Sequence, residues 1–178
     1  MSDVVLSTSA WLSWSAAEKA CFEYICNAVG YKPGVNAFLG DTIPKNLINV
    51  FVFNISGGGS QSQNSQCPRP AKFYKADADL FGRFEKRTNA LEFAGRLLDN
   101  LPAYGDPAKR TGLSGGENII LEPNVQRFEM TTFPILRSII VEVEKVGREG
   151  KVMKAEQTWA LLFNFWVAFN NQNISDSN

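Results

Sequence analysis

Two aspartates separated by one residue are the clearest candidates for chemistry in this chain. Asp77 and Asp79 lie in the segment from Lys72 to Glu85, which reads K-F-Y-K-A-D-A-D-L-F-G-R-F-E. Side chains alternate across a strand, so both carboxylates would point to one face of it. Such a pair can bind a divalent cation or act in acid–base catalysis. We favour the alternative of a solvated or inter-subunit charged face, because Lys75 and Arg83 on the same side balance the charge.

The remaining composition argues against catalysis. The 178 residues include no histidine, which removes the commonest general base and the commonest metal ligand. Glu142 and Glu144 repeat the spacing of the aspartates and receive the same interpretation. Cys21, Cys26 and Cys67 form no C-x-x-C pair, so we expect free thiols rather than disulfides or a zinc site. The sequence therefore predicts no catalytic residue, no metal ligand and no cofactor, and a protein that is not an enzyme.

Length and charge limit the remaining classes. The chain is 44% hydrophobic and carries 18 basic and 18 acidic residues. It is long enough for a hydrophobic core, and we predict a single domain over residues 1–178. A net charge of zero gives no electrostatic basis for binding nucleic acid or a membrane surface. No apolar run reaches the ~18–20 residues of a membrane helix, and no basic region precedes an apolar run at the N-terminus. We therefore expect neither a membrane span nor a secretory signal.

The aspartates belong to a unit, from Lys72 to Pro102, in which a strand leads directly into a helix. Apolar and polar residues alternate in its first half, and Gly82 on the apolar side predicts a bulge or a close backbone contact. The apolar period then changes to that of a helix. Asn89 and Glu92 predict the start of this helix and Pro102 its end. The apolar residues are Ala76, Ala78, Leu80 and Phe84 in the strand, and Leu91, Ala94, Leu97, Leu98 and Leu101 in the helix.

Segments before this unit predict another helix and another strand. Ser15-Ala-Ala-Glu18 is a capping box, which predicts a helix from Ala16 to Val29. The run from Leu47 to Ile55 is almost all β-branched or aromatic, and this indicates a strand buried on both faces.

Segments after the unit alternate as half-buried strands do. They are Val125–Thr131, Ile139–Lys145 and Thr158–Phe169, and the short link Gly147–Lys154 makes the last two antiparallel neighbours. In the second of these strands we expect Ile139, Val141 and Val143 to face inward. The complete order predicts an α+β fold, a mostly antiparallel sheet with two helices packed on one face and a long hairpin loop.

The last strand and the loops are the features most typical of a contact surface. One face of Thr158–Phe169 is aromatic and aliphatic, and the other is too apolar to remain in water. The glycine-rich loop 56–71 is typical of an arm that becomes ordered on assembly. A second long loop is expected at 102–118 and a frayed tail at 170–178. The candidate interface residues are Trp159, Phe163, Phe165, Trp166 and Phe169, then Gly57, Gly58 and Gly59, and finally Asp77, Asp79 and Arg83.

The order of elements resembles that of the tail-terminator proteins of long-tailed bacteriophages. In that family a first helix, here Ala16–Val29, precedes a strand rich in valine and aromatic residues, here N-L-I-N-V-F-V-F-N-I at Asn46–Ile55. A long hairpin follows, then a strand that passes directly into the second helix, here Lys72–Leu101. Two closing strands complete the order, here Ile139–Val146 and Trp159–Phe169.

The resemblance implies a structural protein of the virion tail, made in the host cytoplasm, that is no enzyme and needs no cofactor. It implies a homo-oligomeric ring, a hexamer, that caps the tail tube and joins it to the head. The implied partners are further copies of the chain, the tail tube protein and the head–tail connector protein. The longer second loop and the aromatic last strand depart from the family, which leaves open a related neck, tail-completion or tube protein. A different class also stays open, a small α+β ligand-binding domain or enzyme that uses Asp77 and Asp79.

Overall fold

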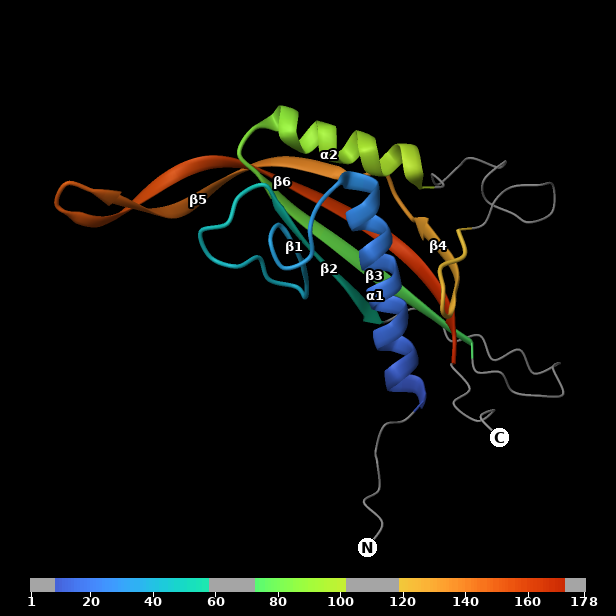
Figure 1. Ribbon diagram of the computed structural model, residues 1–178. Coiled ribbons are helices and arrows are strands. Elements are labelled where there is room, and N and C mark those ends of the chain that lie inside the picture. Colours follow the sequence, from blue (N-terminus) through green and yellow to red (C-terminus); the bar gives the residue numbers. More distant parts are fainter. Residues whose placement is uncertain (1–8, 58–72, 102–118, 172–178) are drawn as a thin grey trace, which may run out of the picture.

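The computed structural model describes residues 9–57, 73–101 and 119–171. These residues form two helices and one mixed sheet of six strands, most of them antiparallel, so the α+β class is confirmed (Figure 1). The elements in chain order are α1 (Ser9–Val29), β1 (Ala37–Leu39), β2 (Val50–Gly57), β3 (Phe73–Phe84), α2 (Arg87–Asn100), β4 (Val125–Met130), β5 (Ile135–Gly147) and β6 (Gly150–Asn170).

The sheet is organised around β6, which is 21 residues long. The strand order is β1-β2-β3-β6-β4, and β5 also pairs with β6. One edge of β6 pairs with β3, from Trp159 opposite Phe84 to Asn170 opposite Phe73. The other edge pairs first with β5 and then with β4. The parallel pair is β1 with β2, and every other pair in this sheet is antiparallel.

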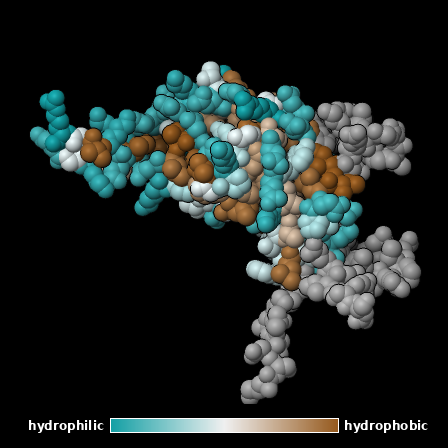
Figure 2. All heavy atoms as spheres, viewed as in Figure 1, coloured by the Kyte–Doolittle hydropathy of each residue, from teal (hydrophilic) through white to brown (hydrophobic). Residues whose placement is uncertain are grey.

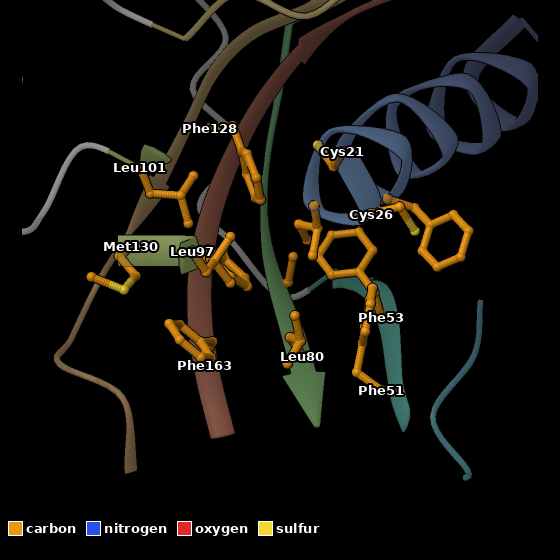
Figure 3. Close-up of a cluster of buried hydrophobic side chains, with 14 of the residues drawn as sticks. Cys21, Cys26, Phe51, Phe53, Leu80, Leu97, Leu101, Phe128, Met130 and Phe163 are labelled. Carbon is orange, nitrogen blue, oxygen red and sulfur yellow. The ribbon is translucent and has the colours of Figure 1, made fainter. Parts of the chain in front are cut away.

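The larger core cluster lies on one face of the sheet and is rich in phenylalanine (Figure 3). The ring of Phe51 in β2 contacts Phe22 of α1 and Phe93 of α2, with centroids 5.9 Å and 5.4 Å apart. Phe163 and Phe165 of β6 belong to the same cluster, and both side chains are buried. Burying one such side chain stabilises the fold by about 1.5–3 kcal/mol. This cluster therefore joins both helices to the central strands. A smaller cluster, formed by Ile43, Val50 and Val52 with Phe81 packed against it, lies on the opposite face.

The predicted alternation in β3 is confirmed. Ala76, Ala78, Leu80 and Phe84 are buried in the core, and the intervening residues lie on the opposite face. The strand pairing continues without interruption through Gly82, so there is no bulge at this position. The glycine instead makes room for the ring of Phe84, two residues further along the same face.

Tertiary contacts replace the helix caps that the sequence predicted. The first helix begins at Ser9 rather than Ala16, so the predicted capping box lies inside it. Glu18 accepts a hydrogen bond from the backbone N–H of Ile55 at 2.8 Å, and Trp14 Nε1 donates to the Ile55 carbonyl at 3.1 Å. These two bonds fix α1 to the end of β2.

The second helix also differs from its predicted start. It begins at Arg87, and the N-cap residue Lys86 makes no side-chain capping bond. Asn89, the predicted cap, lies within the helix and donates to Asn49 Oδ1 at 3.2 Å. Asn49 Oδ1 also accepts from the N–H of Glu85 at 3.1 Å, so a residue before β2 holds the turn into α2.

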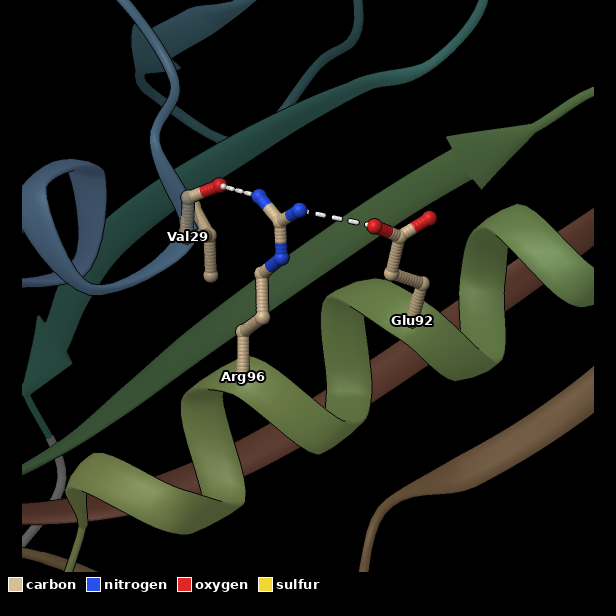
Figure 4. A network of polar contacts seen from close by, with 3 residues as sticks. All are labelled: Val29, Glu92 and Arg96. Atoms are coloured by element: carbon tan, nitrogen blue, oxygen red, sulfur yellow. Dashed lines mark hydrogen bonds and ion pairs between the residues drawn. The ribbon is translucent and has the colours of Figure 1, made fainter.

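The two helices are joined by Arg96 (Figure 4). Its Nη1 donates to the carbonyl oxygen of Val29 at 3.1 Å, and its Nη2 lies 2.7 Å from Glu92 Oε1. The carbonyls at the end of a helix lack intrahelical partners, and an arginine is a favourable partner there. Arg96 therefore satisfies the end of α1 from the surface of α2.

Several strand boundaries differ from those expected. β2 begins at Val50 rather than Leu47 and includes Ser56 and Gly57, which had been placed in the first long loop. Residues 148 and 149 alone separate β5 from β6, so the expected link Gly147–Lys154 is a tight turn with Gly147 opposite Gly150. The remainder of the first loop, the second loop and nearly all of the tail lie outside the described residues.

The inward orientation predicted for Ile139, Val141 and Val143 is wrong. The residue of β5 that packs against the core is Leu136, opposite Leu161. Side chains alternate along β5, so the odd-numbered residues lie on the face opposite the core. The apolar residues of β5 do alternate with polar ones, but they lie on the face of the sheet opposite the larger core cluster.

Substitution of Gly82 tests how closely the side chains of β3 pack in the core. A Cβ at this position would lie 2.5 Å from Cε2 of Phe84, whose side chain is fully buried. We expect Gly82→Ala to lower the free energy of unfolding by about 1–3 kcal/mol, because the ring must shift within a packed core. Gly95→Ala in α2 is the matched control, since nothing lies within 4 Å of a Cβ there. The control should gain roughly 0.5–1 kcal/mol. Urea unfolding measures both changes, and a Gly82→Ala variant as stable as the parent would contradict the close packing.

Candidate functional site

The most distinctive feature of the molecule is a β-hairpin that continues beyond the part of the sheet in which β3 pairs with β6, which we call the body. The chain leaves β3 after Phe84 to enter α2, and Phe84 lies opposite Trp159. Beyond that point β6 pairs with β5 alone, as far as Gly147 opposite Gly150. We call residues 139–158 the hairpin arm. Figure 1 shows the arm projecting away from both helices.

The arm exposes apolar side chains. Ile140 is 76% exposed, Val146 83% and Met153 57%. Apolar and polar side chains alternate along it in the view of Figure 2. A two-stranded ribbon of this kind is marginally stable by itself in water. The arm therefore exposes apolar surface that no other described part of the chain covers.

Cross-strand ion pairs stabilise the arm within the isolated chain. Lys145 pairs with Glu156 on one face, and Lys151 pairs with Glu144 at 3.3 Å on the other. Exposed pairs of this kind contribute about 0.2–1 kcal/mol each. Charged residues along free strands also discourage edge-to-edge pairing with other chains. The faces of the arm, more than its edges, are thus available for contact.

The arm continues the sheet face that lies opposite the core, which we call the outer face. On this face Ile139, Val141 and Val143 of β5 stand beside Thr158, Glu156 and Lys154 of β6, respectively. Nearer the body the same face carries Ile135 beside Leu162 and Phe81. An apolar band therefore runs from the body of the sheet onto the arm.

Two hollows lie side by side on the outer face of the body. One, of about 270 Å³, is lined by Phe81, Ile135, Arg137, Ile139, Ala160 and Leu162. The other, of about 380 Å³, includes Asp41, Asp79 and Asn164 and shares Phe81 and Leu162 with the first. Together they form what we call the outer-face groove, which has an apolar floor with carboxylates at one end.

Basic groups lie toward the other end of the groove. Arg83 and Arg137 stand on either side of Ala160 in adjacent strands. Arg83 Nε is buried and has no hydrogen-bond partner among the residues that the structure describes. Asp41, Asp79 and Arg137 form no ion pair within the same described residues. The groove thus offers separate acidic and basic groups on either side of an apolar floor.

The structure separates the predicted interface residues into two groups. Phe163, Phe165 and Phe169 are buried in the core of their own chain, so they do not offer a contact surface. Aromatic alternation in a final strand indicates burial but does not distinguish a core from an interface. Trp159 and Trp166 are half-buried, on opposite faces of β6. Trp166 already contacts cations of its own chain, Lys75 at 5.1 Å and Arg127 at 5.3 Å from the ring centroid.

The charged candidates all lie on the outer face. Asp77 is exposed, whereas Asp79 and Arg83 are half-buried. Asp79 lies between Asn54 and Asn164 in the neighbouring strands, and it lines the groove. Gly57 ends β2, and a Cβ there would lie 3.4 Å from the Trp14 ring, while Gly58 and Gly59 lie outside the described residues.

The acidic pair does not form a metal site with other described residues. No group of three or more His, Cys, Asp and Glu residues that could hold a metal ion occurs in 9–57, 73–101 and 119–171. Asp77 and Asp79 share one face, as the sequence predicted, and their neighbours are amides and an aromatic ring.

Neither described helix is both long and apolar enough to cross a bilayer.

The cysteines of α1 are buried free thiols. Cys21 and Cys26 both lie against the core, and Cys67 is outside the described residues. Burial raises the pKa of the Cys26 thiol to about 11, with a smaller contribution from Glu23, and it raises the pKa of Cys21 further. A thiol must ionise to act as a nucleophile. These two side chains therefore contribute to packing rather than to chemistry.

Comparison of the chain with protein-family models, curated proteins and solved structures gave no match. The outer-face groove and the arm are thus defined by their geometry alone. Sequence reasoning found the two strands but missed the arm. The signal that was available is the alternation of Lys145–Glu156, where valines and charges continue without a loop residue except around Gly147 and Gly150.

Removal of the arm should leave the body folded. Ser138 lies opposite Trp159, so Asn-Gly can replace residues 139–158 as a two-residue hairpin turn. The larger buried cluster contains no residue of the arm, and Thr158 at its base is the one residue of the arm that is buried, so we expect the free energy of unfolding to change by about 1 kcal/mol. Leu161→Ala, which truncates a buried side chain just beside the cut, should lose about 2–5 kcal/mol. Chemical unfolding compares the two, and an arm-less chain that fails to fold would contradict the division between arm and body.

The buried thiols should make stability fall at high pH. A thiol whose pKa is higher in the folded chain stabilises the fold below the unfolded pKa, near 9.0, and this contribution is lost as the pH rises toward about 11 for Cys26. We expect the midpoint of urea unfolding to fall across this range, and to fall less steeply in Cys26→Ala. Unfolding curves at several pH values measure the difference. Parallel profiles for parent and variant would contradict the assignment.

Proposed function

We propose that this protein is a structural component that assembles with further copies of itself, and that the hairpin arm makes the contacts. The observation that carries the proposal is the arm itself, a two-stranded ribbon with apolar side chains exposed on both faces. Such a ribbon is an unfavourable feature of a permanent monomer, because it exposes apolar surface without contributing to the core. Docking on another chain would remove that surface from water.

The outer-face groove supports the same proposal. It has an apolar floor, and its carboxylates and guanidinium groups lie around that floor as polar groups do in the rim of a protein interface. A net charge of zero also removes the long-range repulsion between copies. These properties suit protein–protein contact better than the binding of a compact small molecule.

The more specific proposal is a ring at the end of a phage tail tube. It rests on the order of elements, which resembles that of tail terminators, and it makes the tail tube and the head–tail connector the neighbours of the ring in the virion. The number of copies implied by the resemblance is six. A ring is also the simplest closed assembly that a projecting arm can build.

Comparison of the complete chain with the arm-less chain tests self-assembly. Light scattering over a wide concentration range should show a species several times the mass of one chain, and negative-stain images should show rings. The arm-less chain should stay monomeric, because the contact surface is lost while the core is kept. A complete chain that remains monomeric throughout, or an arm-less chain that forms the same rings, would contradict the proposal.

The specific location needs a separate measurement. An antibody against the chain should label purified virions at the junction of head and tail. Labelling along the whole tail would instead indicate a tube protein, and unlabelled virions would refute a role in the tail.

A further inference from the structure

We propose that the outer-face groove of one copy receives the hairpin arm of a second copy, face to face, with Lys154 of the arm beside Asp79 of the groove. This inference rests on the proposed function and goes beyond it, because it names the two surfaces and the ion pair that join them. The arm and the groove meet at Ile139 and otherwise occupy different parts of the molecule, so each copy would use both.

The apolar parts of the two surfaces match. The outer face of the arm presents the half-buried Val141 and Val143 and the exposed Val152, and the floor of the groove presents Phe81 and Leu162. The exposed Ile140, Val146 and Met153 lie on the other face of the arm. Both surfaces are made largely of β-strands, and two such faces pack with their side chains interdigitated about 10 Å apart. From Ile139 to Gly147 the arm spans about 27 Å at ~3.4 Å per residue, enough to cross several strands of a neighbouring sheet.

The charges also match. On the outer face of the arm, Lys145 is held by Glu156, whereas Lys154 forms no ion pair with any described residue. In the groove, Asp79 and Asp41 are two carboxylates that equally lack an ion-pair partner in the described part of the chain. In the docked arrangement Lys154, which lies next to the valines of the arm, would therefore meet the carboxylates that lie next to the apolar floor of the groove.

A chain cannot fill its own groove in this way. Ile135 and Arg137 of β5, which line the groove, continue directly into the arm. The arm would have to fold back on the ribbon from which it extends, whereas Figure 1 shows it running outward. A second copy supplies arm and groove together, while an unrelated partner would cover one of them and leave the other exposed.

The contact that results is heterologous, because two different surfaces meet. Heterologous contacts repeat from copy to copy and close into a ring when the rotation permits. The charged residues along the arm oppose the competing edge-to-edge pairing of strands. The proposed docking therefore gives the ring a defined direction, with every arm pointing the same way around it.

Charge reversal with restoration tests the pairing. Lys154→Glu and Asp79→Lys should each weaken self-association at least ~10-fold, because each places like charges against one another at a contact shielded from water. The double variant, which exchanges the two charges, should recover association to within about threefold of the parent. Glu144→Lys/Lys151→Glu is the matched control, since it reverses the charges on the opposite face of the arm and keeps the ion pair between them. It should associate as the parent does.

Sedimentation equilibrium gives the association constant of each variant, and circular dichroism confirms that each is folded. If the parent assembles and the single reversals have no effect, or the exchange restores nothing, the docking is wrong while the proposed function stands. If Glu144→Lys/Lys151→Glu weakens assembly as much as Lys154→Glu, the face of the arm is assigned wrongly. If the parent itself stays monomeric, both the docking and the proposed function are overturned.

Discussion

The structure depends above all on the hydrogen-bonded ladders of β6. This strand pairs along one edge with β3 and along the other with β4 and β5, so removing it would leave no continuous sheet. Its inward residues, among them Phe163 and Phe165, also fill the centre of the aromatic core. Sheet pairing and core packing are thus carried by the same residues, and β6 cannot shift its register by one residue without moving those rings to the opposite face.

A difference in strand length gives this scaffold the projecting arm that we propose as a contact surface. β3 ends where the chain turns into α2, a turn that Asn49 holds, while β5 and β6 continue past it. The larger core cluster joins residues of both helices to the central strands, and the outer face carries the groove beside the smaller cluster of Ile43, Val50 and Val52. The arm follows from one fact, that β6 is longer than the strand beside it in the body of the sheet. We thus propose that the contact surfaces are the arm and the outer-face groove, which lie outside the larger core cluster.

The strands of the body were largely predictable from sequence, because apolar alternation in β3 and β4 reports burial directly. The helix starts were not, since Glu18 and Asn89 bind partners distant in sequence instead of capping their own helices. The candidate site was predicted in part: Asp79 and Arg83 line or flank the groove, whereas Phe163 and Phe165 belong to the core. The prediction that Ile139, Val141 and Val143 face inward is wrong for a related reason. Period-2 alternation identifies a strand with one apolar face, but it does not say which partner covers that face.

Hydrogen exchange at two protein concentrations tests the central claim most directly, that the arm is unpartnered in one chain and covered in the assembly. In dilute solution the amides of residues 139–158 should exchange far faster than those of 161–169 on the same strand, because the arm opens without disturbing the core. In concentrated solution the arm should become strongly protected, and the groove residues around Phe81 and Leu162 should gain protection with it. Protection of the arm that does not change with concentration would contradict the account.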